Sequence, residues 1–386
     1  MAKLDDLFKI MKEQGASDLH VTTGAAPYLR VHGDMVRLNY RDLSAEETQA
    51  LLFEILTERQ KKTFIDNWEL DCTYAAPGVG RVRVNIYMQR KGLGGSFRFI
   101  PDEILPIEKL NLPKSILDMV SVDRGLVLVT GPTGSGKSTT LASMIDYINQ
   151  NERGHIITVE DPIEFVHPNK NCLVNQREIS SHTKSFAKAL KSALREDPDV
   201  ILVGEMRDLE TISLAMTAAE TGHLVLGTLH TNNAAKTVDR IIDIFPAEQQ
   251  AQVRTMLSES LRGVVAQTLF KRADKPGRVA AVEILFNTPA ISNLIREGKT
   301  FQIPSIMQTG KSQGMVNFDS YIQELLKDGR VARDDALKFL GKAKAQTTTS
   351  TETQAPQTAQ NVAGVAPKAP ATNVAGHINV PNKKTG

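Results

Sequence analysis

The first residues of the chain combine two patterns of hydrophobic side chains. Residues 4–14 repeat apolar side chains at helical spacing, which predicts an amphipathic helix. Residues 17–21 and 28–38 instead alternate apolar with polar side chains. Because alternation is the period of a half-buried strand, these two stretches predict a β-hairpin, with a turn at His32-Gly33-Asp34.

A long strand follows a second helical stretch. Residues 44–66 have helical spacing, and Ser44 followed by Glu47 is typical of a capping box. The predicted strand after it has an apolar face with Val82, Val84, Ile86 and Met88 and a polar face with Arg81, Arg83, Asn85 and Tyr87. Residues 92–100 predict its antiparallel partner. We therefore expect a small α+β domain over residues 1–100.

The pattern changes near residue 121, after a proline-punctuated stretch that we interpret as a linker, residues 101–120. Beyond it the strands are short continuous apolar runs separated by helices, as in a parallel sheet covered on both faces. The predicted strands are 126–130, 155–160, 200–203 and 223–229. One predicted helix begins at Lys137, and two more cover residues 185–195 and 210–221. Past Val264 the chain is predicted to be mostly helical to about Ala343. This region, residues 121–345, is interpreted as an α/β domain.

Residues 346–386 contain Thr, Gln, Ala, Pro and Asn with almost no large apolar side chain. Such a segment cannot bury enough surface to fold, so we predict a disordered tail.

The overall composition argues against several classes of protein. There are 46 basic and 44 acidic residues, a formal charge of +2, and 5% aromatic residues, so we expect no nucleic-acid binding. Cys72 and Cys172 cannot form a tetracysteine zinc site and indicate a reducing compartment. Acidic residues near Met1, and the lack of an apolar run of about twenty residues, predict a cytoplasmic protein.

The clearest chemical motif is a phosphate-binding loop of the pattern G-x-x-x-x-G-K-[ST]. It follows an apolar strand and precedes a predicted helix, as a strand-loop-helix unit requires. Its glycines let backbone N–H groups point at phosphate oxygens, while Lys137 is expected to bridge the β and γ phosphates and Ser138 to bind Mg²⁺. The motif comprises Gly131, Pro132, Thr133, Gly134, Ser135, Gly136, Lys137, Ser138 and Thr139. We therefore predict that the chain binds a nucleoside triphosphate.

Acidic side chains follow two of the predicted strands. Glu160, Asp161 and Glu164 lie where a buried strand ends, which in parallel sheets is the edge that lines the ligand crevice. We expect Glu160 to orient the attacking water, with Glu164 as second choice; the alternative is that these acids only cap a loop. After residues 200–203, glycine replaces the aspartate of an ordinary Walker B strand, so Glu205 is expected to reach Mg²⁺ directly or through water.

Two histidines, His223 and His230, bracket the predicted strand 223–229. Without a third ligand they are poor evidence for zinc. We interpret them as groups that hydrogen-bond the phosphate region and sense its state, with ordinary polar strand ends as the alternative.

Together these segments, residues 131–139, 156–164, 200–208 and 221–231, resemble the Walker A motif, Asp box, atypical Walker B motif and His box of the secretion-type ATPase superfamily. The chain is most similar to its branch of type IV pilus retraction ATPases, from Met1 to about Ala343. The resemblance implies a PAS-like N-terminal domain and a RecA-like ATPase domain with a helical C-terminal part. It further implies ATP and Mg²⁺ as ligands, and a homohexamer with nucleotide sites between domains.

The resemblance also implies further site residues and partners. Arginines of the N-terminal domain reach the phosphates in that family, and Arg81, Arg83 and Arg98 match those positions. Without the resemblance, a solvated basic face is the simpler interpretation. The implied partners are an inner-membrane pilus platform protein and a paralogous retraction ATPase, which would hold the chain at the cytoplasmic face of the inner membrane.

One segment departs from the family pattern. Residues 290–297 match a stretch that retraction ATPases need for retraction rather than hydrolysis, but Ser292 stands where arginine is usual. The resemblance thus implies a hexameric ATP-hydrolysing motor that disassembles pilus fibres. The alternatives are an accessory retraction paralogue, a RecA-like nucleic-acid translocase, and a nucleotide-gated switch without turnover.

Overall fold

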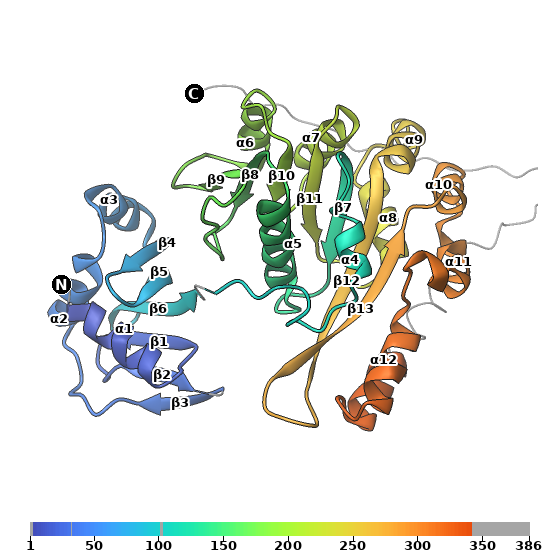
Figure 1. Cartoon of the computed structure of the whole chain (residues 1–386). Coiled ribbons are helices and arrows are strands. Elements are labelled where there is room, and N and C mark those ends of the chain that lie inside the picture. The colour runs from blue at the N-terminus through green and yellow to red at the C-terminus, as the bar shows by residue number, and fades with distance from the viewer. Residues whose placement is uncertain (1–2, 32, 101–102, 342–386) are drawn as a thin grey trace, which may run out of the picture. The chain divides into compact units, whose positions relative to one another are not determined.

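The structure is a computed structural model that describes residues 3–31, 33–100 and 103–341. Its N-terminal part contains a six-stranded antiparallel sheet in the order β3-β2-β1-β6-β5-β4 (Figure 1). The strands are β1 Asp18–Thr22, β2 Tyr28–Val31, β3 Asp34–Arg37, β4 Glu69–Ala76, β5 Gly80–Gln89 and β6 Gly92–Ile100. The predicted hairpin is present, with Val31 opposite Asp34, while His32 lies outside the described residues.

Helices cover one face of this sheet. They are α1 Lys3–Glu13, α2 Ala45–Glu54 and α3 Glu58–Asn67, and their apolar side chains pack with those of the strands around Phe8 and Phe97. The single helical stretch predicted over residues 44–66 is in fact two helices. The predicted capping box at Ser44 is formed, but a second box at Thr57 starts a new helix and so breaks the first.

The opposite face of the N-terminal sheet is polar. Cross-strand partners on it form a row, in which Asp18 lies opposite Arg98 and Arg98 opposite Arg83. On the apolar face Val82, Val84 and Ile86 are buried as predicted, whereas Met88 at the end of β5 is exposed.

A second, seven-stranded sheet has the order β13-β12-β7-β11-β10-β8-β9. Its strands are β7 Gly125–Thr130, β8 His155–Glu160, β9 Leu173–Glu178, β10 Val200–Val203, β11 Leu224–Leu229, β12 Leu261–Lys271 and β13 Arg278–Phe286. Every pair is parallel except β12 with β13. The four strands predicted from continuous apolar runs are all present, and β7, β10 and β11 are buried throughout.

Helices lie on both faces of the second sheet (Figure 1). They are α5 Lys137–Asn151, α6 Phe186–Ala193, α7 Leu209–Glu220, α8 Ala234–Asp243 and α9 Gln250–Ser260. The short helix α4 Ser115–Asp118 lies in the stretch interpreted as a linker, where Ile107 and Ile116 are buried in the same apolar cluster as α5. No helix among the described residues has the length and apolar character needed to cross a bilayer.

The prediction that the chain becomes mostly helical past Val264 is wrong for residues 264–286. Strands β12 and β13 form a long antiparallel hairpin there, and helices follow only afterwards. The error has a physical cause, because a continuous apolar run does not distinguish a buried strand from a buried helix. The later helices are α10 Pro289–Arg296, α11 Ile303–Thr309 and α12 Phe318–Lys327, with the 3-10 turns η1 Thr300–Gln302 and η2 Gly310–Gln313.

Glu283 on β13 connects this hairpin to two helices. Its carboxylate accepts the backbone N–H of Ala234, the first residue of α8, at 2.8 Å, and also that of Phe318, the first residue of α12. Burial raises the pKa of Glu283 to about 7. The predicted tail, residues 346–386, lies outside the described residues.

Candidate nucleotide site

The predicted phosphate-binding loop, residues 131–139, joins β7 to α5. Gly131, Gly134 and Gly136 have φ angles of 144°, 78° and 90°, a left-handed backbone that favours glycine. A Cβ atom at Gly131 would lie 2.2 Å from the carbonyl oxygen of Gln267, so the loop also needs glycine for close packing. The loop therefore has the backbone form that turns successive N–H groups toward one side.

Polar groups of this loop are available to an anion. The Lys137 ammonium donates to the carbonyl oxygens of Gly131 and Pro132, at 2.9 and 3.1 Å, and so lies folded over the loop. In the described part of the chain, the buried Ser135 Oγ has no hydrogen-bond partner. Backbone donors, an ammonium group and an unpaired hydroxyl fit a phosphate group, and Ser138 at the start of α5 adds the hydroxyl expected for Mg²⁺.

The electrostatics of Lys137 connect the loop to two predicted acids. Burial lowers the pKa of Lys137, while the charges of Glu205 and Glu164 raise it. Both carboxylates thus act on the lysine, although they come from different strand ends. Strands β8 and β10 are parallel neighbours, which brings their carboxyl ends to the same edge of the sheet.

Glu160 is the last residue of β8. Its carboxylate accepts hydrogen bonds from Thr158 Oγ1 at 2.6 Å and Gln176 Nε2 at 3.1 Å. Burial raises its pKa to about 7, although these two hydrogen bonds act in the opposite direction. Glu160 is therefore held in a fixed position and titrates near neutral pH, whereas Glu164 is exposed.

Glu205 follows β10 and lies beside one of the two predicted histidines. His230 Nε2 is 2.8 Å from Glu205 Oε1, and the Arg207 guanidinium forms an ion pair with the same carboxylate. Burial favours the neutral carboxyl, but hydrogen bonds and charge from Arg207, together with His230, hold the pKa of Glu205 below its usual range. Glu205 is thus an anion, as a metal-associated role requires.

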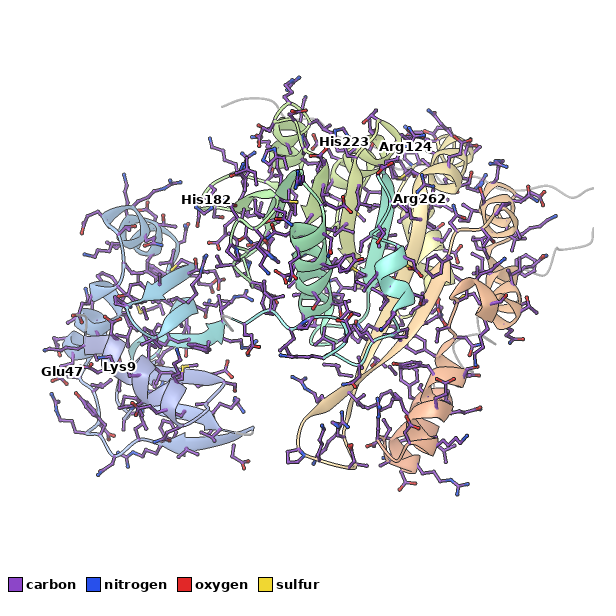
Figure 2. All side chains as sticks on the ribbon, in the orientation of Figure 1. Lys9, Glu47, Arg124, His182, His223 and Arg262 are labelled. Atoms are coloured by element: carbon purple, nitrogen blue, oxygen red, sulfur yellow. The ribbon has the colours of Figure 1, made fainter. Side chains whose placement is uncertain are left out.

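The structure does not bring His223 to this edge of the sheet. His223 precedes β11, and its carbonyl accepts the N–H of Gly125 at the start of β7. Its ring Nδ1 contacts the carbonyl of Ala218 at 2.9 Å. Figure 2 shows His223 near Arg124 and Arg262. Because β11 is parallel to β7, its first residues lie at the end of the sheet away from the phosphate loop, which follows β7. The two histidines therefore lie at opposite ends of one strand.

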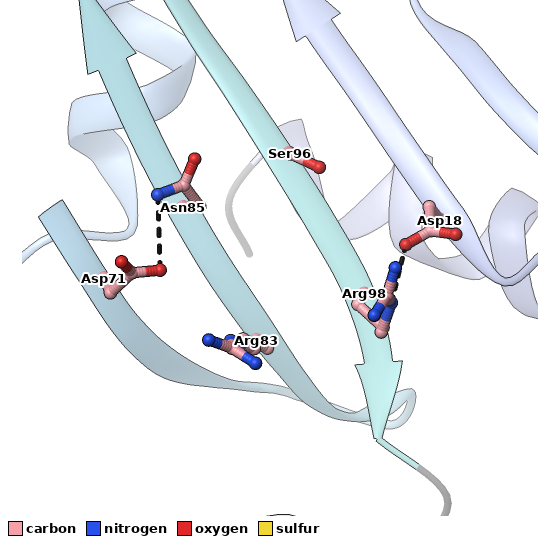
Figure 3. A pocket seen from close by; sticks show the side chains of 6 residues that line it. All are labelled: Asp18, Asp71, Arg83, Asn85, Ser96 and Arg98. Atoms are coloured by element: carbon pink, nitrogen blue, oxygen red, sulfur yellow. Dashed lines mark hydrogen bonds and ion pairs between the residues drawn. The ribbon is translucent and has the colours of Figure 1, made fainter. Parts of the chain in front are cut away.

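Two of the three predicted arginines line a pocket on the polar face of the N-terminal sheet (Figure 3). The pocket has a volume of about 330 Å³ and is lined by Asp18, Asp71, Arg83, Asn85, Ser96 and Arg98. Arg98 Nε donates to the buried Asp18 carboxylate at 2.8 Å. Arg83 is exposed, and among the described residues its guanidinium has no hydrogen bond or ion pair, although its charge lowers the pKa of Asp161 against the effect of burial.

The third arginine, Arg81, lies elsewhere. It donates to Thr73 Oγ1 at 3.1 Å and lies 3.7 Å from the buried carboxylate of Glu178. Glu178 in turn accepts the backbone N–H of Ile163 at 3.1 Å, within the acidic segment that contains Glu164. Arg81 is therefore already paired with a carboxylate, unlike Arg83.

One residue that contacts the phosphate loop directly, Gln267 on β12, was not predicted from the sequence. Its carboxamide Nε2 donates to the carbonyl of Ser135 at 2.7 Å, and its Oε1 accepts from Thr140 Oγ1 at 2.8 Å. One signal was present in the sequence. A single glutamine interrupts an apolar run, and a polar side chain in a buried strand needs a partner.

The chain was compared with known proteins. Residues 108–347 match the family model described as "Type II/IV secretion system protein". The chain is 54% identical over 333 residues to the "Type IV pilus retractation ATPase PilT" of Pseudomonas aeruginosa, covering 86% of this chain and 96% of that protein. It is 42% identical to the "Type IV pilus ATPase PilU" of the same organism, over 87% and 88% of the two chains.

Solved structures give a similar result. The chain resembles the "Crystal Structure of the Pilus Retraction Motor PilT and Bound ADP" with a TM-score of 0.83 and 47% identity, covering 88% of this chain and 97% of the other. The ATPase DotB of Legionella pneumophila is more distant, with a TM-score of 0.75 and 29% identity over 88% and 95% of the two chains.

Proposed function

The chain belongs to the type II/IV secretion system protein family, and on this premise we propose that it is an ATP-hydrolysing motor that powers type IV pilus retraction. The observation that carries the proposal is its 54% identity to a pilus retraction ATPase over 86% of the chain. The phosphate-binding loop supports it independently, because Lys137 lies within the electrostatic reach of Glu164 and Glu205.

Residues of the second sheet would bind and orient the nucleotide. Backbone N–H groups of residues 131–139 would hold the phosphates, apart from Pro132, which has none, and Ser135, whose N–H donates to the Pro132 carbonyl. The Lys137 ammonium would leave its two carbonyl partners to contact the phosphates. Ser138 and Glu205 would hold Mg²⁺, which when bound neutralises charge on the phosphates. His230 keeps the Glu205 carboxylate oriented, and its position beside that group supports a sensing role for this histidine alone.

Glu160 is the proposed group that positions the attacking water and accepts its proton. Its hydrogen bonds to Thr158 and Gln176 fix the carboxylate, and a pKa of about 7 suits a base at neutral pH. Glu164 is the second candidate, because it is exposed and its charge acts on Lys137.

Arginines of the N-terminal sheet are proposed to complete the site within a homohexamer. Arg83 and Arg98 are the better candidates, since Arg81 is paired with Glu178. The proposed domains are a PAS-like domain at residues 1–100, a linker at 101–120 and a RecA-like ATPase domain at 121–345. The motor would act at the cytoplasmic face of the inner membrane on a pilus platform protein, together with a paralogous retraction ATPase.

An accessory retraction ATPase is the second candidate function, favoured by the 42% identity to a PilU protein over 87% of the chain. A nucleic-acid translocase has no such support. A nucleotide-gated switch differs from a motor in one measurable property, because it binds ATP without steady-state turnover.

Two measurements test the proposal. The purified full chain should hydrolyse ATP at steady state, and a chain that binds ATP without turnover would be a switch. Deleting the gene from its host should leave surplus surface pili with lost surface motility. Normal motility after deletion would instead favour the accessory function.

A further inference from the structure

The middle of β12 carries one buried polar side chain that the proposed chemistry does not use. Gln267 is 3% exposed and lies between buried apolar neighbours, Val265 and Ala266 on one side and Phe270 on the other. Both polar atoms of its carboxamide are paired, Nε2 with the Ser135 carbonyl and Oε1 with the Thr140 hydroxyl. A carboxamide in such a place is costly unless it is fully paired, so its partners indicate its purpose.

Both partners of Gln267 belong to the phosphate-binding unit. Ser135 lies within the loop, and Thr140, which is 1% exposed, lies in the first turn of α5. The backbone of Gln267 also touches the loop, since a Cβ atom at Gly131 would lie 2.2 Å from its carbonyl oxygen. A Cβ atom at Gly136 would lie 2.8 Å from Gln267 Nε2. Gln267 therefore contacts the phosphate-binding loop near the first residue of the loop and near its last glycine.

The bond to Ser135 fixes a direction as well as a distance. In a planar trans peptide the carbonyl of one residue and the N–H of the next point in opposite directions. Because Gln267 holds the Ser135 carbonyl toward β12, the N–H of Gly136 must point away from β12. That is the side to which a phosphate-binding loop presents its donors.

We propose that Gln267 is a positioning residue of the nucleotide site. It holds the Ser135–Gly136 peptide so that the Gly136 N–H faces the β and γ phosphates, and Thr140 fixes which end of the carboxamide faces Ser135. The inference rests on the proposed function, because it needs a nucleotide at residues 131–139. It adds a residue from the hairpin that sequence patterns alone did not assign to a strand.

The test compares Gln267→Met with a matched control in the full-length chain. Methionine keeps the length of the side chain but neither donates to Ser135 nor accepts from Thr140. Asn287→Leu is the control, because the Asn287 carboxamide donates to the Ser258 and Leu261 carbonyls at 2.9 Å, away from the loop. ADP affinity is measured by calorimetric titration, ATP turnover at steady state, and folding by thermal unfolding.

We expect Gln267→Met to raise the Kd for ADP about tenfold, because one phosphate donor is no longer held in place. The KM for ATP should rise by a similar factor with less change in kcat, since a loop N–H contacts the phosphates before and during the reaction. Asn287→Leu should lower the unfolding temperature but keep the ADP affinity of the unsubstituted chain.

Thr140→Val provides a second variant in case Gln267→Met fails to fold. Valine has the shape of threonine, and losing the hydroxyl leaves the carboxamide free to turn, so we expect a smaller rise in Kd of about threefold. Unchanged ADP affinity in the folded variants would overturn the positioning role alone. An equal loss of affinity in Asn287→Leu would also overturn it. An unsubstituted chain that binds no ADP would overturn the proposed function and this inference with it.

Discussion

The N-terminal sheet and the second sheet present their polar side chains in different places. In the antiparallel N-terminal sheet one face is covered by helices, so polar residues such as Arg83 and Arg98 occupy the other face along the whole strand. In the second sheet both faces are covered, and β7, β10 and β11 are buried throughout. The carboxylates proposed for catalysis and metal binding there, Glu160 and Glu205, lie at or just after the strand ends.

This difference determines how firmly each group is held. Glu160 and Glu205 lie next to rigid buried strands and have two or more partners each. Arg83 is exposed and acts on Asp161 through its charge without a hydrogen bond, whereas Arg98 is held by the carboxylate of Asp18. The carboxylates at the strand ends of the second sheet, which we call the edge, are therefore in place before a nucleotide binds. The arginines on the polar face of the N-terminal sheet, which we call the face, must be positioned by a ligand or a second chain.

The largest effect should come from the edge, with Lys137→Ala. The variant removes the only side-chain cation of residues 131–139, so we expect ATP hydrolysis to fall by about 1000-fold or more while the protein still folds. Steady-state hydrolysis and circular dichroism check this, with Lys188→Ala on the exposed side of α6 as control. Normal hydrolysis by Lys137→Ala would contradict the nucleotide assignment.

Glu160→Gln should have the next largest effect, slowing hydrolysis about 100-fold while sparing most ATP binding. Burial raises the pKa of Glu160 to about 7, and a base acts only when deprotonated. The kcat of the unsubstituted chain should therefore rise as pH increases through about 7 and level off above it.

The pH dependence of kcat tests whether Glu160 or Glu164 is the base. The rise in kcat with pH should disappear in Glu160→Gln. It should persist in the control Glu283→Gln, although burial raises the pKa of Glu283 to about 7 as well. Rapid hydrolysis by Glu160→Gln, with its pH dependence intact, would favour Glu164 instead.

The polar face should contribute less than the edge. Arg98→Ala is expected to lower kcat about tenfold, the effect of losing one charge-assisted contact, and Arg83→Ala to act similarly. Asp18→Asn should reduce kcat less, because it loosens Arg98 without removing its charge. Full ATP hydrolysis in both arginine variants would show that the residues of the second sheet suffice for hydrolysis in this chain.

The smallest effect on hydrolysis is expected at α10. Ile291, Leu294 and Ile295 are buried there, whereas Arg296 and Glu297 are exposed. The double variant Arg296→Ala with Glu297→Ala should keep ATP hydrolysis and the hexamer but stop pilus retraction in cells. A parallel loss of hydrolysis and folding would show that the segment is only structural.

Ser292 is the residue of this segment where the family usually has arginine. Its hydroxyl donates to the carbonyl of Ser258 at 2.6 Å, so it is tied to α9 rather than presented outward. We therefore expect residues 290–297 to act in retraction through Arg296 and Glu297, without a third charge at position 292.

The sequence predicted most of the edge and part of the face. Residues 131–139 and the strands of continuous apolar residues could be found because glycine spacing and burial leave direct marks in a sequence. Strand alternation likewise identified the polar face with Arg83. The β12–β13 hairpin could not be found this way, because apolar runs without a period are ambiguous. Gln267 could not be found for the same reason, and its partners, the Ser135 carbonyl and the Thr140 hydroxyl, lie far away in the chain.

The two histidines flank one apolar run, and a sequence does not say which end of a strand meets the ligand until its neighbours are known. In the structure β11 runs parallel to β7 and β10, so His223 lies at the start of the strand and His230 lies beside Glu205 at its other end.

The β12–β13 hairpin has a further consequence. Gln267 contacts the phosphate loop. The residue before it, Ala266, lies opposite Glu283 in the hairpin register, and Glu283 accepts the first N–H groups of α8 and α12. A nucleotide that shifts this hairpin would change how α12 is held, and thermodynamic linkage makes the relation reciprocal. A partner that binds the C-terminal helices more tightly when ADP is bound must raise the affinity for ADP by the same factor. Mechanical load on those helices would then change the affinity of the site for its nucleotide.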